Sequence, residues 1–331
     1  MALKLSFILP CYNVERYIAD SLDSLFTLDL PENEFEVICV NDCSTDGTRE
    51  IIVHYAEQHP NLTLIDHEEN LTAGGARNTG IKVAQGEYIW FVDPDDMIKS
   101  ETAGGMYDMA HEAGLDILMF NFAYVDEDLN YKGTIRLFAN SDVKTGQDYV
   151  LAYFPGKISK LCIVWRCLYR TAFLKEKALV FPHMRKSQDV VFLWKTMLSA
   201  SSVQSVDEIA YVYRINPYSV GAKKWNAVAF FSERILFASE IIKLLGDPRL
   251  MIDDTIRKDM EKAALWSANS SLSTLMKMPE EELGKYYYET VKHGDEIKNV
   301  KPYLNRKNRF LYSSFGGLRF WLLKLKLLKQ R

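Results

Sequence analysis

Three carboxylates lie within four residues of one another, at Asp93, Asp95 and Asp96. Two such charges about 4 Å apart, at an effective dielectric near 20, repel by roughly 4 kcal/mol, and a divalent cation removes that repulsion. Carboxylate oxygens suit Mg²⁺ or Mn²⁺, which usually share their coordination with substrate phosphates. The cluster directly follows the apolar run 88–92, and this position favours a metal site over a solvated acidic turn in which Asp96 caps a helix.

Polar, turn-rich segments also follow three earlier apolar runs, at 10–13, 41–48 and 70–78. In an open parallel sheet, ligands bind beyond the carboxyl ends of the strands, so these four segments predict one ligand site. Gly74 and Gly75 are open to two interpretations. They either shape a loop or let backbone amides at a helix N-terminus approach a phosphate.

The elements that must position these segments alternate along the first 125 residues. Short continuous apolar runs predict strands at 5–9, 36–40, 62–65 and 87–92. Helices are predicted between them, the first capped by Asn13 and the later ones at 49–59 and 76–84. This alternation is typical of an α/β fold whose mainly parallel sheet is covered on both faces.

The rhythm changes after residue 116. We expect longer, more exposed strands at 116–125 and 133–138, helices at 147–154 and 189–199, and an almost entirely helical stretch from 225 to 292. The predicted organisation is therefore a domain at 1–220, with halves 1–125 and 126–220, followed by a helical C-terminal region at 221–331.

Composition excludes several classes of protein. The 331 residues are 48% hydrophobic and 25% charged, which argues against a disordered or fibrous chain. No apolar run reaches the roughly 18 residues that a membrane-spanning helix needs. Residues 299–331 hold nine Lys or Arg and no acid, so the rest must carry −13 for the total to be −4. An acidic body argues against nucleic-acid binding, and five cysteines without a Cys-x-x-Cys pair suit a reducing cytoplasm.

Four motifs carry a family resemblance, and they occur in this order: Phe-Ile-Leu-Pro-Cys-Tyr-Asn-Val-Glu at 7–15, Val-Asn-Asp-Cys-Ser-Thr-Asp-Gly-Thr at 40–48, Gly-Ala-Arg-Asn-Thr-Gly at 75–80 and Val-Asp-Pro-Asp-Asp at 92–96. Together they resemble the family 2 glycosyltransferases, an inverting family with the GT-A nucleotide-diphospho-sugar fold. The resemblance is strong over about 4–125 and thins towards 220. It implies a mixed α/β sheet, a nucleotide-diphospho-sugar donor that is UDP-linked, and Mn²⁺ or Mg²⁺ as cofactor.

The resemblance also implies roles for single residues. Those that match the nucleotide-sugar site are Pro10, Tyr12, Asn13, Asp42, Arg77 and Asp93. Asp42 would accept a hydrogen bond from uracil, and Asp95 would bind the metal that bridges the diphosphate. Two alternatives stay open, because Asp42 could simply make turn hydrogen bonds and Arg77 could pair with a surface acid.

The base that activates the acceptor is expected in the second half of the domain. Family members commonly carry Glu-Asp before a helix, with the Asp as base, and this chain has Gln188 followed by Asp189. Asp189 could equally be an N-cap or first-turn acid, where the helix dipole favours a carboxylate. A positioned carboxylate is also a usable base, so the two roles are compatible.

The segment 165–170 resembles a stretch that lines the acceptor side in relatives. Trp165 and Tyr169 could stack on sugar rings while Arg166 donates hydrogen bonds. A core position for Trp165 is the alternative. The segment 211–219 resembles a loop that closes over the diphosphate in some relatives.

The tail 310–331 mixes Phe, Trp and Leu with Lys and Arg. Such a segment suits an anionic membrane surface, although it could instead pack on the acidic body. The family and the tail together predict a cytoplasmic enzyme, peripheral on the inner membrane face, that acts on a saccharide or lipid-linked saccharide in bacterial surface polysaccharide assembly. The alternatives are a non-catalytic nucleotide-sugar-binding assembly protein and an aspartate-dependent phosphotransferase.

Overall fold

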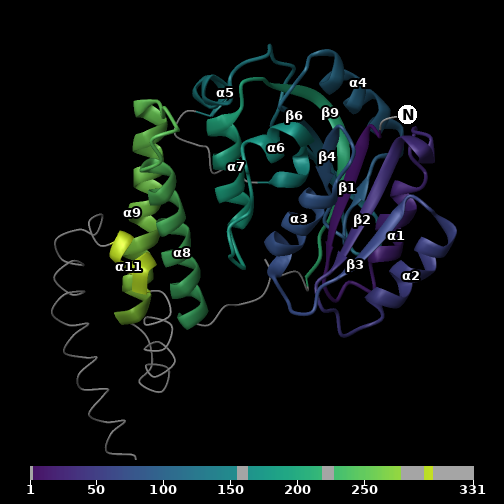
Figure 1. The fold of residues 1–331 in the computed structure, drawn as a ribbon, viewed down its shortest axis with the longest axis horizontal. Helices are drawn as coiled ribbons and strands as arrows, with labels where there is room; N and C mark the ends of the chain where they lie inside the picture. Colours follow the sequence, from purple (N-terminus) through teal and green to yellow (C-terminus); the bar gives the residue numbers. More distant parts are fainter. Residues whose placement is uncertain (1–2, 155–162, 218–226, 277–293, 301–331) are drawn as a thin grey trace, which may run out of the picture. The chain divides into compact units, whose positions relative to one another are not determined.

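The computed structural model describes residues 3–154, 163–217, 227–276 and 294–300. The chain divides into two compact units, Met1–Ala222 and Lys223–Arg331. The first unit is a mixed sheet with helices packed on it, and the second is helical (Figure 1). The polar segments identified in the sequence all belong to the first unit.

The sheet has nine strands in the order β3-β2-β1-β4-β8-β6-β9-β5, with β7 paired to β6. The strands are β1 (Leu5–Cys11), β2 (Phe35–Asn41), β3 (Leu62–Asp66), β4 (Tyr88–Phe91), β5 (Met97–Ile98), β6 (Ile117–Val125), β7 (Tyr131–Ile135), β8 (Cys167–Arg170) and β9 (Val203–Arg214). Strands β1 to β4 are mutually parallel, and so are β6 and β9. Because β8 is antiparallel to both β4 and β6, these two groups point the same way and end at one edge of the sheet.

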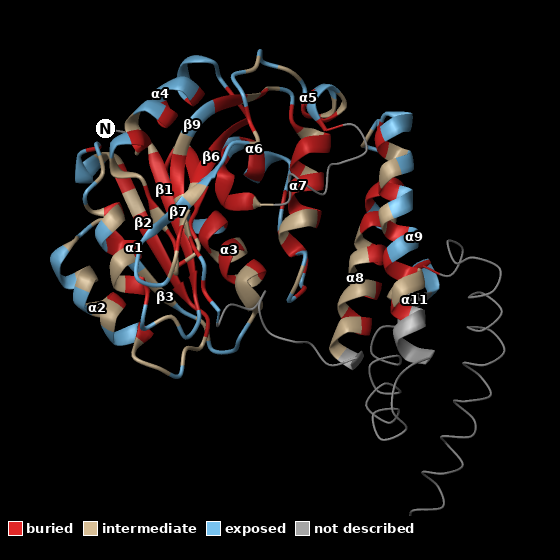
Figure 2. Cartoon of the chain, turned by 180° about the vertical axis from the view of Figure 1, so that it is seen from behind, coloured by how far each residue is buried: buried red, intermediate tan, exposed pale blue. Residues whose placement is uncertain are grey.

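The helices of the first unit are α1 (Ile18–Leu25), α2 (Thr48–Gln58), α3 (Thr72–Val83), α4 (Ala103–Glu112), α5 (Gly146–Tyr153), α6 (Thr171–Glu176) and α7 (Gln188–Ser199). Helix α3 contacts β1 and β2, and α4 contacts β6 and β8. Every residue of β1 and of β4 is buried, as expected for strands without a solvent face. Figure 2 shows the buried strands of the sheet, β1 among them, in red between helices with exposed outer faces.

Several predicted element positions are wrong. Strand β6 was expected to be exposed, but most of it is buried because it lies between β8 and β9. Asn13 does not cap α1, which begins five residues later. Gly74 and Gly75 lie inside the first turn of α3, which begins at Thr72, and not in a loop before it. Strands β8 and β9 were not predicted at all.

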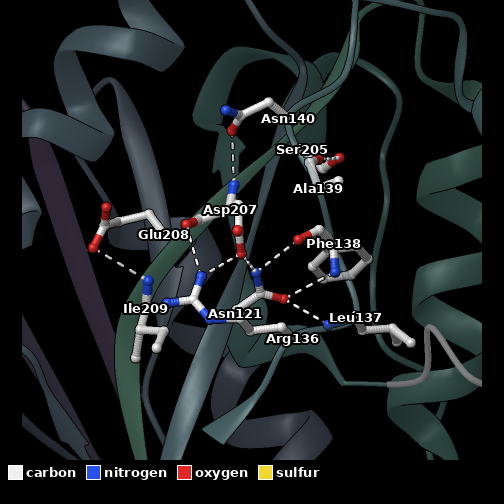
Figure 3. Close-up of polar contacts among 10 residues, drawn as sticks. All are labelled: Asn121, Arg136, Leu137, Phe138, Ala139, Asn140, Ser205, Asp207, Glu208 and Ile209. Atoms are coloured by element: carbon white, nitrogen blue, oxygen red, sulfur yellow. Dashed lines mark hydrogen bonds and ion pairs between the residues drawn. The ribbon is translucent and has the colours of Figure 1, made fainter.

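A polar cluster stabilises the irregular pairing of β6 with β9, whose register shifts on both sides of Asn121. The side-chain amide of Asn121 donates to the Phe138 carbonyl oxygen at 2.8 Å and to Asp207 at 2.9 Å, and its oxygen accepts from the backbone of Leu137 and Phe138. Arg136 pairs with Asp207 at 2.5 Å (Figure 3). Because every donor and acceptor of the Asn121 amide is used, the cluster fixes β9, the strand whose far end reaches the candidate site.

The second unit contains α8 (Ala227–Leu245), α9 (Asp254–Met276) and α11 (Gly294–Val300), and α8 packs against both of the others. The predicted C-terminal helical region is confirmed. The basic tail at 310–331 lies outside the described residues. Within the described segments, no helix is long and apolar enough to cross a membrane.

Candidate active site

The loops that follow β1 and β2 are joined by hydrogen bonds at the carboxyl edge of the sheet. Cys11 and Asn41 form the last paired position, so Tyr12 and Asp42 follow it side by side. Asn13 has a φ of 52°, and its side-chain oxygen accepts from the backbone N–H of Thr45 at 2.8 Å. Tyr12 is 47% exposed, which leaves its ring available to a ligand, whereas Pro10 is buried within β1.

Asp42 is buried and already hydrogen-bonded within the protein. Its Oδ1 accepts from the ring Nδ1 of His67 at 2.7 Å and from the backbone N–H of Leu71 at 2.8 Å, and the side-chain amide of Asn70 donates to its carbonyl oxygen. The turn role is therefore real. The hydrogen bonds from the described residues to this carboxylate reach only Oδ1, so Oδ2 remains an acceptor for a ligand.

Arg77, on α3, forms an ion pair with Asp93 rather than with a surface acid, at 2.5 Å between guanidinium and Oδ1. The Arg77 side chain is 7% exposed and lies over the ring of Phe181. This pair brings the third and fourth polar segments of the sequence together, as their common position at strand ends predicts.

Asp96 is fully buried and holds the acidic segment onto β9, so its alternative role as a helix cap is wrong. Its carboxylate accepts from the hydroxyl of Tyr211 at 2.9 Å and from the backbone N–H of Arg214 at 2.8 Å. The Tyr211 oxygen in turn accepts from the backbone N–H of Asp93. Burial, followed by repulsion from Asp95 and Asp93, raises the pKa of Asp96.

Asp95 lies at the centre of this segment and is only partly buried. The side-chain amide of Asn216 donates to its Oδ2 at 2.8 Å, and the Asn216 oxygen lies 3.4 Å from the hydroxyl of Tyr17. Burial, followed by repulsion from Asp93, raises the pKa of Asp95. A bound cation would favour the ionised carboxylate.

The donor set suits a metal that is completed by substrate. The described part of the chain contains no group of three or more His, Cys, Asp and Glu side chains that could hold an ion by themselves. Asp95 offers one carboxylate oxygen that is not fixed by Asn216. Mg²⁺ commonly binds through one or two carboxylates plus substrate phosphates, so these residues fit such an ion.

Asp189 lies in the first turn of α7, after Ser187, which occupies the cap position with a φ of 58°. It is a first-turn acid and not the cap, and its Oδ1 accepts from the backbone N–H of Val190 at 2.9 Å. Burial raises the pKa of Asp189, and the positive charge of Arg77 opposes that rise. The charge of Arg77 therefore acts on Asp189, at the start of α7, while its guanidinium pairs with Asp93, beyond the end of β4.

Helix α3 holds the segment that leads into α7. The side chain of Asn78 exchanges two hydrogen bonds with the backbone of Phe181, at 2.8 and 2.9 Å, and Thr72 donates to the carbonyl oxygen of Met184. A β-carbon at Gly74 would lie 1.9 Å from Oε1 of the buried Gln188. The absence of a side chain at Gly74 therefore makes room for Gln188, the residue beside Asp189.

The prediction that Trp165, Arg166 and Tyr169 contact the acceptor is wrong for this structure. Trp165 is 5% exposed and stacks on Tyr211 with ring centroids 4.1 Å apart. Arg166 is 2% exposed and packs against the ring of Phe138, and Tyr169 is fully buried. The core position is the correct alternative for Trp165, which supports the acidic segment from behind through Tyr211.

Sequence reasoning missed the residues that hold the carboxylates in place, namely His67, Tyr211, Arg214 and Asn216. Segment 211–219 was predicted to be a loop over the diphosphate, but Tyr211 and Arg214 belong to β9, and residues 218 and 219 lie outside the described segments. The closely spaced aromatic residues of 211–213 were the one signal of a strand.

Comparison with known proteins agrees with this arrangement. The sequence profile of Glycosyl transferase family 2 matches residues 6–178, more than half of the chain. The chain belongs to glycosyltransferase family 2. A poly(ribitol-phosphate) beta-glucosyltransferase of Bacillus spizizenii is 32% identical over 64% of this family 2 chain and 32% of its own length. The poly(ribitol-phosphate) beta-N-acetylglucosaminyltransferase TarS of Staphylococcus aureus is 34% identical over 64% of this chain and 35% of its own length. The chain thus spans about a third of the length of these relatives.

Solved structures confirm the GT-A fold. The crystal structure of S. aureus TarS 1–349 in complex with UDP-GlcNAc has a TM-score of 0.64 at 26% identity, covering 93% of this family 2 chain and 86% of that one. The mannosyltransferase PcManGT of Pyrobaculum calidifontis, in complex with GDP-Man and Mn²⁺, has a TM-score of 0.54 at 18% identity. The match covers 92% of this chain and 82% of that one. At that identity the second likeness shows the fold alone.

Proposed function

We propose that this chain transfers a sugar from a UDP-linked donor to an acceptor hydroxyl, with inversion at the anomeric carbon. One observation carries the proposal. At one edge of the sheet lie Asp95 and the ion pair between Arg77 and Asp93. The carboxylate of Asp189 is positioned separately, on α7, and the positive charge of Arg77 acts to lower its pKa. A charged donor site beside a potential base is what transfer to a hydroxyl requires.

The donor would lie across the ends of β1, β2 and β4. Tyr12 offers an exposed aromatic face for the base, and the buried carboxylate of Asp42 offers an acceptor beside it. Arg77 and Asp93 would contact the phosphates and the ribose or sugar. Pro10 and Asn13 support the proposed base and ribose site from β1 and its loop. The TarS complex with UDP-GlcNAc supports a uridine donor.

Asp95 would hold Mn²⁺ or Mg²⁺ together with the donor diphosphate. When bound, such an ion supplies charge that stabilises the leaving diphosphate. The contribution of the chain is geometric. Asn216 fixes one oxygen of Asp95 and orients the other, and the buried Asp96 anchors the segment on β9.

Asp189 would take the proton from the acceptor hydroxyl as the hydroxyl oxygen attacks the anomeric carbon of the donor. Burial raises the pKa of this carboxylate and makes it more basic than one in water, whereas the positive charge of Arg77 favours its ionised form. A single displacement inverts the anomeric centre, so an α-linked donor gives a β-linked product.

The acceptor would be a saccharide, or a lipid-linked saccharide, of a bacterial surface polymer. The names of the relatives, which act on poly(ribitol-phosphate), support a surface polymer as the setting.

In this proposal the chain works in the cytoplasm at the inner membrane face, to which the basic tail binds. Deletion of residues 318–331 should abolish binding to anionic liposomes at low salt while leaving transfer to a short soluble acceptor intact. Unchanged liposome binding would overturn the membrane role of the tail.

The decisive assay is turnover of a panel of UDP- and GDP-sugars by the full chain, with and without Mn²⁺. We expect UDP release from one uridine donor, dependent on Mn²⁺ and on Asp189. Membership of family 2 argues against the phosphotransferase alternative. Donor binding without any release of UDP would favour the non-catalytic alternative.

A further inference from the structure

The carboxylate of Asp42 is held from one side only. Two donors, the ring Nδ1 of His67 and the backbone N–H of Leu71, converge on Oδ1. No hydrogen bond from the described part of the chain reaches Oδ2. The backbone of Asp42 is fixed as well, since its N–H donates to the Cys11 carbonyl oxygen at 2.8 Å. Because the two oxygens belong to one planar group, the hydrogen bonds that fix Oδ1 also fix the orientation of Oδ2.

His67, directly after β3, can set Oδ1 because its own ring is fixed at both nitrogens. A carboxylate oxygen only accepts, so Nδ1 must carry the proton that is shared with Asp42. Nε2 forms a hydrogen bond with the hydroxyl of Thr79, on α3, at 2.9 Å, as the acceptor when the ring is neutral and as the donor when it is protonated. The backbone N–H of His67 donates to the carbonyl oxygen of Asn41 at 2.9 Å. Thr79, His67 and Asp42 thus form one continuous chain of hydrogen bonds.

We infer that His67 is a positioning residue that determines nucleotide specificity, because it fixes Asp42 with Oδ2 facing a base that stacks on Tyr12. The inference deepens the proposed function and rests on a nucleotide binding at this edge. The base selected is one with an N–H on the edge that meets Oδ2, as in uracil. Cytosine presents a bare ring nitrogen there, and two acceptors repel.

The preference should be large enough to measure. A hydrogen bond to a charged group changes affinity by about tenfold or more, and an unpaired buried acceptor weakens the wrong ligand further. Without the His67 donor the carboxylate keeps only the backbone N–H of Leu71 at Oδ1 and can rotate, so that Oδ2 no longer faces the base in a fixed orientation. Loss of His67 should therefore weaken UDP and leave CDP almost unchanged.

The test is equilibrium binding of UDP and CDP to the full chain by calorimetry, in the presence of Mn²⁺. His67→Phe keeps the ring volume and removes both nitrogens. His67→Asn retains a donor close to the position of Nδ1, and Thr79→Val removes only the outer hydroxyl. We expect the UDP-over-CDP preference to fall about tenfold in His67→Phe, less in Thr79→Val, and to be largely restored in His67→Asn. Melting temperature serves as the control for folding.

The outcomes separate this inference from the proposed function. Equal weakening of UDP and CDP in His67→Phe, or an unchanged preference in a folded variant, would overturn the role of His67. If His67→Phe does not fold, the other two variants decide the question. An unaltered UDP-over-CDP preference in Thr79→Val together with a lost preference in His67→Asn would overturn the hydrogen-bond chain. A wild-type chain that binds neither nucleotide would overturn the donor assignment itself.

Discussion

Replacement of Asp189 by Asn should separate donor binding from transfer. Asn keeps an oxygen that can accept from the backbone N–H of Val190, so the first turn of α7 should stay intact. Arg77, whose charge acts on Asp189, keeps its partner Asp93 at 2.5 Å and is not left unpaired by the change. UDP affinity should therefore stay within a few fold of the wild type.

Transfer should fall in the same Asp189→Asn variant by roughly 10² to 10⁴, the usual contribution of a positioned base, which corresponds to about 2.7 to 5.4 kcal/mol in the activation barrier. Only the ionised carboxylate can accept a proton. Wild-type turnover should therefore rise with pH through a pKa that burial places above the ordinary value of 3.8. That rise should be absent from the residual activity of the variant.

The assay pairs single-turnover transfer with calorimetric binding of UDP. Asp148→Asn is the matched control, because Asp148 is an exposed first-turn acid on α5 and has no place in the proposed site. The control should transfer at the wild-type rate. Loss of UDP binding in parallel with transfer in Asp189→Asn would show that Asp189 is a donor-site or structural residue, and the base would have to lie elsewhere.

Three further substitutions test other parts of the site. Asp95→Asn should abolish the Mn²⁺-dependent turnover of the donor. It should also raise the melting temperature at pH 7, and that gain should disappear towards pH 4. The sign follows because burial raises the pKa of Asp95 above its ordinary 3.8, so its ionised form costs stability that the acid form does not. Trp165→Ala should cost about 3 to 5 kcal/mol in the free energy of unfolding, as expected of a buried aromatic, whereas a sugar platform would cost little by denaturant titration. Gly74→Ala should displace Gln188 and slow transfer more than it weakens UDP binding, and Gln188→Ala in the same chain should restore part of the rate.

The parts of the site that depend on local sequence could be predicted. Asp42 directly follows β2, and Asp93 and Asp95 lie within four residues of the end of β4. Parallel strands bring such positions to one edge whatever their distance in the sequence. Arg77 was identified through its family motif, although its ion pair with Asp93 was not predicted. These predictions required only the direction of the strands and no knowledge of which strands are neighbours.

The supports of the site could not be predicted, because they depend on long-range register. Asp96 looks like a surface acid in sequence, yet it is buried because β9 brings Tyr211 and Arg214 against it from more than a hundred residues away. Asn216 reaches Asp95 by the same route. A polar residue that serves a distant partner has no local signature.

The aromatic residues of 165–170 illustrate a different difficulty. Trp and Tyr on a short strand have the same spacing whether they stack on a sugar or on the core. Strand β8 runs antiparallel between β4 and β6, and that central position buries Tyr169. Trp165 lies in the 3-10 turn just before β8 and is buried against Tyr211 of β9. Only the strand order decides between the two roles.

A crystal structure of the full chain with UDP and Mn²⁺ would show directly whether these residues bind the donor. We expect uracil on the ring of Tyr12 with its N–H donating to Oδ2 of Asp42. We also expect an anomalous manganese peak bridging Asp95 and the diphosphate. A nucleotide bound away from the ends of β1 and β2, or a manganese ion held without Asp95, would contradict the proposed donor site.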